Sequence, residues 1–382
     1  MSPSDVVETP YLTAEHHDFR ADVRAALEVI VLPAADAWEA ERRIPGSAWR
    51  ALGGEGLLGL PHAGTGFLSS AVFLEELGRT GYAGVRAAVG VAAYMAPAYL
   101  EMFGSSDQRE AHLPAVRRGE QVMALAISEA ASGSDLRNLQ TRAAHSDPEG
   151  DSVTGQKHYV ANGSQADLIV TLVRTTDASG SSGVAGSSLF LIDARSAGVS
   201  VRPQPMLGWH AADMCRLDLD SVAVPADRLI GRRNRALIYL MKCLDFERLV
   251  IGLSTIGGVA HCLELLRTLL REHKVRGVAL GAHQAVQHRM AELVGDFELV
   301  RQYAYYAAWR HCMGTLDTRT ATILKLKATT LEVATAQACL QYHGARGYLS
   351  ESVAARIYRD AAATTIAGGA SELLRDLVYE TW

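Results

Sequence analysis

The chain has 382 residues, of which 48% are hydrophobic and 21% charged, and its formal net charge is −5 at pH 7. This composition predicts a globular protein rather than a disordered one, and the slight acidic excess argues against a nucleic-acid-binding protein. We find no run of roughly 18 apolar residues that would span a bilayer and no basic-then-apolar signal peptide, so we expect a soluble, cytoplasmic protein.

The spacing of the hydrophobic residues changes twice along the chain. Residues 13–118 have helical spacing, and residues 121–225 have the shorter period of strands. Helical spacing returns from residue 234, with interruptions near 277–281 and 344–347. Helices, then a small sheet, then helices predict an α+β fold rather than alternating βα units. The predicted parts are an N-terminal helical domain (1–120), a small middle β-domain (121–231) and a C-terminal helix bundle (232–382).

Three segments of the middle part are typical of strands. They are Val170–Val173, Leu189–Ile192 and the alternating apolar residues from Cys215 to Leu219. Between the first two lies a run rich in serine and glycine, Ser179–Ser188, which predicts a mobile hairpin connection.

Several classes of chemistry are disfavoured because their motifs are missing. The sequence has no GxGxxG after a strand, no P-loop, no HExxH and no GxSxG. Its five cysteines are widely spread without a CxxC pair, which argues against a disulfide framework and a thiolate metal site. The histidines do not pair with carboxylates at metal-ligand spacing, and we therefore expect no bound metal.

Two segments of the middle part carry candidate binding residues. In Leu125–Asp135 a predicted strand runs into a loop of small residues, where Ser134 or Asp135 can cap the next element. Such loops expose backbone N–H groups to planar or anionic ligands. In Gly155–Asp167, the pair Asn162-Gly163 is typical of a hairpin turn.

Together with Arg142, these two segments resemble the middle domain of the acyl-CoA dehydrogenases. The pattern of that family is roughly TEPxAGSD, then TRA, then GxKxxITNGxxAD. The resemblance extends over about residues 12–379. Further stretches that look like family motifs, in the family's order, are Phe103–Gly119, Val222–Gly231, Gln341–Tyr348 with Arg359-Asp360, and Ser371–Arg375.

The resemblance implies an FAD enzyme that removes the α-proton and the β-hydride of an acyl thioester, held by coenzyme A or by an acyl carrier protein. It also implies a C-terminal four-helix bundle, a homo-oligomer (dimer or tetramer) whose neighbouring subunit helps to hold the cofactor, and an electron-acceptor flavoprotein or oxygen as partner. The residues at the family's flavin-contacting positions are Leu125, Ile127, Ser128, Gly133, Ser134, Tyr159, Ala161, Gln284, Gln341, Gly344, Ala345, Ala370 and Glu372.

The catalytic base is expected at an alternative position of the family. Much of the family carries a Glu in the pattern IxEGTSE, but this chain has Gly368 at that point. A second group, resembling isovaleryl- and long-chain acyl-CoA dehydrogenases, places the Glu in a context close to LDLERL, which matches Leu244–Leu249 here. The resemblance therefore implies Glu247 as the base, with a backbone N–H of Gly368 for the thioester carbonyl. Asp245, Arg248 and Ser134 would line the substrate site. The alternative without a catalytic role is that Glu247 and Arg248 are a solvated pair on a helix.

Other departures bear on cofactor and substrate. Ala161 and Ala370 replace threonines near the flavin and its phosphates, and the neighbour-subunit clamp is altered in His273–Gln284, so we expect FAD to bind less tightly than usual. The loop Leu60–Phe67 is short where the family borders its substrate. By analogy with similarly altered relatives we expect a role in antibiotic biosynthesis. Two alternatives remain open, namely a flavin monooxygenase of the same fold and a degenerate scaffold without catalysis.

Overall fold

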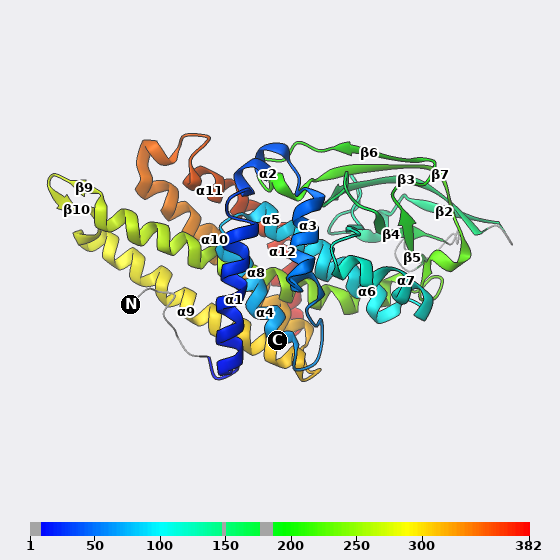
Figure 1. The fold of residues 1–382 in the computed structure, drawn as a ribbon, viewed down its shortest axis with the longest axis horizontal. Coiled ribbons are helices and arrows are strands. Elements are labelled where there is room, and N and C mark those ends of the chain that lie inside the picture. Colours follow the sequence, from blue (N-terminus) through cyan, green and yellow to red (C-terminus); the bar gives the residue numbers. More distant parts are fainter. Residues whose placement is uncertain (1–8, 147–149, 176–185) are drawn as a thin grey trace. The chain divides into compact units, whose positions relative to one another are not determined.

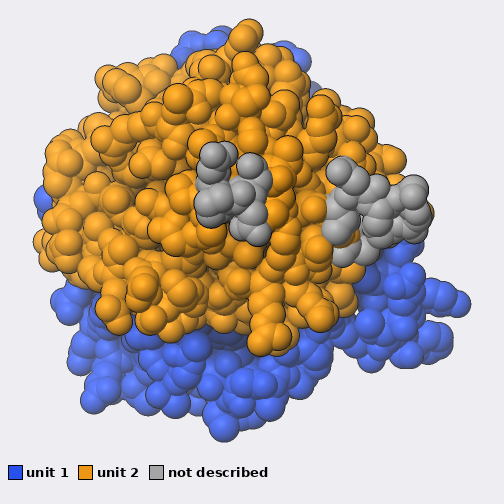
Figure 2. Space-filling view, turned by 90° about the vertical axis from the view of Figure 1, so that its right-hand side faces the viewer, with its two compact units in different colours: residues 1–32, 60–86, 248–382 blue, residues 33–59, 87–247 orange. Residues whose placement is uncertain are grey.

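A computed structural model describes residues 9–146, 150–175 and 186–382 (Figure 1). The chain forms two compact units, coloured separately in Figure 2, and each is assembled from segments that are distant in sequence. Unit 1 contains Met1–Leu32, Leu60–Arg86 and Arg248–Trp382, and unit 2 contains Pro33–Gly59 and Ala87–Glu247.

Unit 1 is built from helices. They are α1 (Ala14–Ile30), α4 (Phe67–Arg79), the greater part of α8 (Ala236–Glu272), α9 (Gln284–Cys312), α10 (Thr318–Gly347), α11 (Val353–Thr364) and α12 (Ser371–Glu380). Helix α4 packs against α1 and α9, and α10 packs against α9, α11 and α12. Side-chain caps start two of them: Asp317 accepts the Thr320 N–H at 2.7 Å, and Ser352 accepts the Ala355 N–H at 3.0 Å.

Two contacts fix helix α4 in unit 1. A Cβ atom on Gly78 would lie 2.0 Å from the carbonyl oxygen of Ser254 on α8, so only glycine permits this close approach. On its other side α4 carries the buried carboxylate Glu75, which accepts hydrogen bonds from Arg20 of α1 at 2.8 Å and Arg301 of α9 at 2.7 Å. Burial alone would raise the pKa of Glu75, but the two arginines hold it well below its usual range. The network ties three helices together.

Unit 2 is built around a sheet. Among the described residues its strands follow the order β6-β7-β3-β2-β4-β5-β8, and β1 pairs with β4 in parallel. The strands are β1 (Met123–Ala126), β2 (Arg142–Ser146), β3 (Gly150–Val160), β4 (Leu168–Arg174), β5 (Ser187–Asp193), β6 (Val199–Pro203), β7 (Cys215–Val224) and β8 (Leu229–Ile230).

Strand β4 is buried on both faces, so its side chains alternate between two cores. Leu168, Val170 and Leu172 pack with helical residues such as Tyr99 and Leu100. Ile169 and Val173 pack with strand residues such as Phe190 and Leu217. The helices of unit 2 are α2 (Ala35–Glu41), α3 (Gly46–Gly54), α6 (Ala96–Phe103) and α7 (Ser106–Arg117). Helix α5 (Ala83–Val89) leads into α6 through a π-helical turn, η2 (Gly90–Met95).

The predicted α+β class is confirmed. Each of the three predicted strand segments lies in a strand, β4, β5 or β7, and β4 pairs with β5 in antiparallel register as a hairpin requires. The connecting run Ser179–Ser188 was expected to be mobile, and residues 179–185 of it lie outside the described residues. The interruptions of the C-terminal helices also match: the short strands β9 (Lys274–Val275) and β10 (Val278–Ala279) form a small hairpin, and Gly344 has non-helical backbone angles inside α10.

Two expectations were wrong. Asn162-Gly163 is not a hairpin turn, because β3 and β4 do not pair with each other and β2 lies between them in the sheet order. The chain does contain an apolar segment of membrane-spanning length: an 18-residue window of α8 has mean hydropathy 1.7. However, 72% of that window is buried within the protein, which is what a core helix shows.

Candidate active site

A buried ion pair shapes the loop that follows strand β1. The Lys157 ammonium on β3, which is fully buried, donates to the Glu129 carboxylate at 2.8 Å and to the Ile127 carbonyl at 3.1 Å. Glu129 also accepts the backbone N–H groups of Gln140 and Thr141 at 2.7 and 2.9 Å. Burial lowers the pKa of Lys157 to about 8, although Glu129 partly opposes that shift. The loop is therefore held at its base by charge-assisted hydrogen bonds.

The predicted flavin-contacting residues of this loop are accessible. Leu125, Ile127 and Ser128 are half-buried, and Gly133 and Ser134 are exposed. The loop closes on a short 3₁₀ turn, Leu136–Asn138, whose cap is Asp135: its carboxylate accepts the Arg137 N–H at 3.0 Å, as the sequence predicted for this position or its neighbour.

Tyr159 lies beside this loop and presents its ring to solvent. Its side chain is 53% exposed, and its backbone has φ +60°, outside the normal range of a strand residue. The Gln204 side chain accepts the Tyr159 N–H at 2.7 Å, and the N–H of the preceding residue, His158, donates to the Ser128 carbonyl at 2.9 Å. Ala161 is buried two residues later. The backbone of the residue before Tyr159 is thus bonded to Ser128, which places these two predicted residues near each other.

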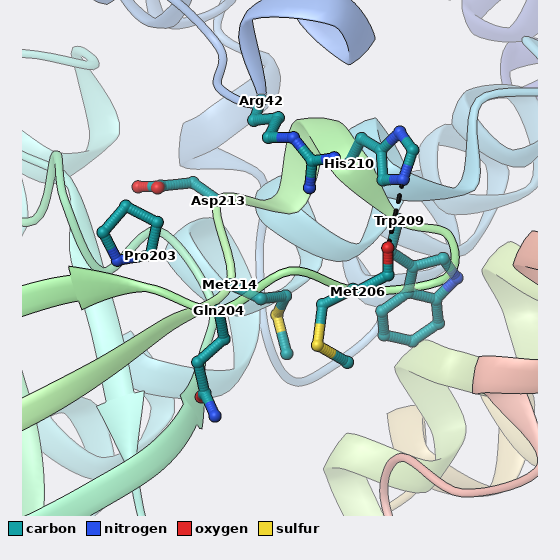
Figure 3. Close-up of a pocket in the computed structure, with 8 residues that line it drawn as sticks. All are labelled: Arg42, Pro203, Gln204, Met206, Trp209, His210, Asp213 and Met214. Atoms are coloured by element: carbon teal, nitrogen blue, oxygen red, sulfur yellow. Dashed lines mark hydrogen bonds between the residues drawn. The ribbon is translucent and has the colours of Figure 1, made fainter.

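Gln204 also lines a small pocket, and Figure 3 shows the side chains around it. Three lining residues, Arg42, Trp209 and Asp213, have positive φ angles of 58°, 57° and 51°. The His210 ring contacts the Met206 carbonyl at 3.2 Å, the dashed line of Figure 3. The lining residues are Arg42, Pro203, Gln204, Met206, Trp209, His210, Asp213 and Met214. None of them is a residue that the sequence predicted for the site.

Glu247 is a buried, hydrogen-bonded carboxylate on helix α8. It is 7% exposed, and the Tyr99 hydroxyl of α6 donates to its Oε1 at 2.8 Å. The Cys243 thiol lies one helical turn earlier, and burial followed by the charge of Glu247 raises the pKa of that thiol. Arg248 is likewise buried, at 5% exposed, so the alternative of a solvated Glu247-Arg248 pair is wrong.

Gly368 lies in a tight turn of unit 1, before helix α12. Its φ is +67°, and a Cβ atom built on it would lie 2.3 Å from Cδ1 of Ile251 on α8. The next residue, Gly369, offers its carbonyl to the Lys325 ammonium at 2.7 Å. Burial and the nearby charge of Arg248 lower the pKa of Lys325 to about 8. A side chain at 368 would therefore be strained by the left-handed backbone and would displace the end of the Ile251 side chain, and the turn is bound to α10 by a buried lysine.

The remaining predicted residues lie at or near the surface. Asp245 is half-buried on α8, and Ala370 is half-buried at the start of α12. Those that are exposed are Gln284 at the first position of α9, Gln341, Gly344 and Ala345 at the kink of α10, and Glu372 in α12. Sequence reasoning missed Tyr99 and Lys325. The signal for Tyr99 was a tyrosine inside an apolar helical run, because a buried phenol needs a hydrogen-bond partner.

Three family models match consecutive parts of the chain. They describe the N-terminal domain (residues 13–120), the middle domain (124–222) and the C-terminal domain (235–382) of acyl-CoA dehydrogenases. The chain belongs to the acyl-CoA dehydrogenase family. It is accordingly an FAD-dependent oxidoreductase that acts on acyl thioesters.

Similar proteins agree with this assignment. The long-chain specific acyl-CoA dehydrogenase of Rattus norvegicus is 31% identical over 96% of this chain and 86% of its own length. The isovaleryl-CoA dehydrogenase of Solanum tuberosum is 28% identical over 86% of this chain and 81% of its own length. Among solved structures, an acyl-CoA dehydrogenase from Geobacillus kaustophilus has a TM-score of 0.90 at 29% identity, covering 98% and 99% of the two chains. The prolyl acyl carrier protein oxidase AnaB has a TM-score of 0.88 at 26% identity, covering 97% and 99%.

The residues of the β1 loop suit the flavin of this family. A planar, hydrogen-bonding ring system needs an apolar bed, a stacking partner and a few polar contacts. Leu125 and Ile127 supply apolar surface, the exposed Tyr159 ring supplies an aromatic face, and Ser128 retains a hydroxyl. The chemistry of this set of residues therefore fits FAD.

Proposed function

We propose that the protein introduces a double bond between the α- and β-carbons of an acyl thioester, with Glu247 as the base that takes the α-proton. FAD, when bound, supplies the acceptor for the β-hydride. The proposal rests on the surroundings of residues 247 and 368. Glu247 is a buried carboxylate, whereas position 368 is a glycine. Ile251 fills the space beside Gly368, and it follows Glu247 on α8 by four residues, one helical turn.

This arrangement explains how a family member works without a Glu at position 368. This chain has no carboxylate at 368, where a side chain would be strained by φ +67° and would displace the end of Ile251, so the proposed carboxylate comes from another element. Glu247 meets the requirement of a general base because it is buried, hydrogen-bonded and held on a long helix. Gly368 would contribute its backbone N–H to the thioester carbonyl, where negative charge develops during proton removal. Asp245, Arg248 and Ser134 would border the acyl thioester.

The proposal extends to cofactor residues and partners. Leu125, Ile127, Ser128, Gly133, Ser134, Tyr159 and Ala161 would hold the flavin ring, and Gln284, Gln341, Gly344, Ala345, Ala370 and Glu372 would meet the rest of FAD.

We propose a homo-oligomer, since Leu237, Ile238 and Met241 at the start of α8 are exposed apolar residues. The acyl group is held by coenzyme A or by a carrier protein, the second being supported by the likeness to AnaB. A cytoplasmic location, a role in antibiotic biosynthesis and a flavoprotein or oxygen as electron acceptor complete the proposal.

The decisive experiment follows the bleaching of bound FAD when acyl thioesters are added. The panel contains straight and branched acyl-CoA thioesters and the same acyl groups on a purified acyl carrier protein. Glu247→Gln is expected to keep FAD and to slow bleaching by about 10²–10⁴-fold, because general-base catalysis is lost. The matched control is Glu264→Gln, which removes a carboxylate on the same helix that forms an ion pair with Arg267 at 3.7 Å.

The possible results separate the alternatives. Full activity of Glu247→Gln would mean that another group is the base. A wild-type protein that binds FAD, is not bleached by any thioester and consumes oxygen with a reduced cofactor would favour a flavin monooxygenase. A protein that cannot be loaded with FAD would be a scaffold, and the proposal would fail.

A further inference from the structure

We infer that Tyr99 is a positioning residue for the base: its hydroxyl holds the Glu247 carboxylate in one orientation and keeps it ionised. The inference rests on the proposed role of Glu247. Its starting point is the 2.8 Å hydrogen bond from the Tyr99 hydroxyl to Glu247 Oε1, which joins two residues 148 positions apart in the sequence.

The Tyr99 ring is held by packing as well as by the hydrogen bond of its hydroxyl. Tyr99 is fully buried and belongs to the apolar core around Leu100, Leu113 and Leu168. A ring packed in this way keeps few rotamers, so the hydroxyl is presented at one point. The carboxylate it contacts is on a long helix, and the pair therefore sets the orientation of the Glu247 carboxylate.

The backbone before Tyr99 explains why it points to the base. Helix α6 follows the π-helical turn Gly90–Met95, which has wider i to i+5 hydrogen bonding than an α-helix. One extra residue in a turn rotates everything after it by about 100° around the helix axis. Without this turn, Tyr99 would lie on another face of its helix. π-Helical turns of this kind are frequent at functional sites.

The hydrogen bond also acts on the charge of Glu247. Burial disfavours an ionised carboxylate, and a donor that bonds the ionised form offsets this effect. Tyr99 remains such a donor across the working range, because burial and then the charge of Glu247 raise its pKa well above the usual value. The Cys243 thiol on α8 faces the same carboxylate and stays neutral for the same two reasons. Tyr99 from α6 and Cys243 from α8 are therefore both neutral neighbours of the carboxylate over the pH range of the assay.

The test is Tyr99→Phe, which removes the hydroxyl and leaves the ring. We measure the rate of FAD bleaching at saturating thioester from pH 5 to 9, using whichever member of the panel bleaches the wild type fastest. We expect FAD content and fold to be retained, the maximal rate to fall about 10-fold, and the acid limb of the pH profile to move up by about 1–2 units, the size of a lost hydrogen bond to a charged group.

The control is Tyr239→Phe on α8. Its hydroxyl accepts the Arg232 N–H at 2.9 Å, and Tyr239 precedes Glu247 on α8 by eight residues, more than two helical turns, so its loss removes a hydrogen bond that does not involve the base. The pH profile of this variant should match that of the wild type. An unmoved acid limb in Tyr99→Phe, or an equal movement in Tyr239→Phe, would overturn the inference. Such a result together with an inactive Glu247→Gln would leave the proposed function intact, whereas an active Glu247→Gln would remove the proposed function itself.

A second measurement keeps the inference testable even if Tyr99→Phe is poorly folded or inactive. Thermal unfolding of the wild type, both single variants and the double variant Tyr99→Phe/Glu247→Gln gives a cycle that does not depend on activity. A charge-assisted bond predicts that Tyr99→Phe lowers the melting temperature more in the wild type than in the Glu247→Gln background. Equal shifts in both backgrounds would show that the two side chains are not coupled, contrary to the inference.

Discussion

The turn at Gly368 permits a quantitative test of why this position carries no side chain. Replacing Gly368 by Ala places a Cβ atom on a backbone with φ +67°, 2.3 Å from Ile251 Cδ1. The left-handed backbone costs about 1–2 kcal/mol for a residue with a Cβ atom, and overpacking costs about 1–3 kcal/mol. We therefore expect Gly368→Ala to lower the free energy of unfolding by about 2–5 kcal/mol, measured by urea denaturation at fixed FAD and protein concentration.

The companion variant Ile251→Val separates the two contributions, because it deletes the Cδ1 atom that the new methyl group would meet. Alone it should cost about 0.5–1.5 kcal/mol. In the double variant the steric part should disappear and the backbone part should remain, so that the combined cost falls short of the sum by about 1–3 kcal/mol. Strict additivity, or a Gly368→Ala variant as stable as the wild type, would refute this account of the turn. The same reasoning predicts that Gly368→Glu restores bleaching to Glu247→Gln only when Ile251 is shortened as well.

Two further predictions concern buried titratable groups of unit 1. The pKa of Lys325 is lowered from 10.5 to about 8, so the unfolded chain holds this proton over a pH range in which the folded chain does not. The wild type should gain stability as pH rises from 8 to 10.5, by about 3 kcal/mol at most, and Lys325→Met should lack this gain when urea midpoints are compared across that range. The pKa of His261 is lowered from 6.5 to about 4 by burial and then by Arg356. The wild type should therefore lose stability as pH falls from 6.5 to 4, and a His261→Gln variant whose acid unfolding curve keeps the full slope would contradict this.

The sequence predicted those elements that show a characteristic apolar pattern over consecutive residues. Strand β4 and helix α8 were detectable because burial imposes a regular or continuous apolar pattern on consecutive residues. The turn at Asn162-Gly163 was misread because strand pairing is not local: β2, from earlier in the chain, takes the place between β3 and β4. A turn signal predicts a reversal of direction, not which strands become neighbours.

The candidate site likewise has features that the sequence predicts and features that depend on residues distant in the sequence. Glu247 and Gly368 were found from family motifs, but their physical reasons lie in residues far away in sequence. Tyr99 donates to Glu247 from another helix, and the left-handed backbone at 368, with Ile251 beside it, favours glycine there. The burial of the Glu247-Arg248 pair was equally beyond the sequence, since an isolated acidic-basic dipeptide on a helix is usually solvated. Lys325 was missed because a lysine in a helical pattern is normally assigned to the surface.

The interleaving of the two units along the chain has a consequence for synthesis. All residues of unit 2 have been made once the ribosome passes residue 247, whereas unit 1 needs its first helices and everything after that point. At 5–20 residues per second, α1 and α4 wait on the order of 10 s for their partner α9 to emerge. During that interval their apolar faces are open to aggregation or to chaperones. Yield in the cell should consequently depend on translation speed between the end of α4 and the end of α9, which sets the length of that interval.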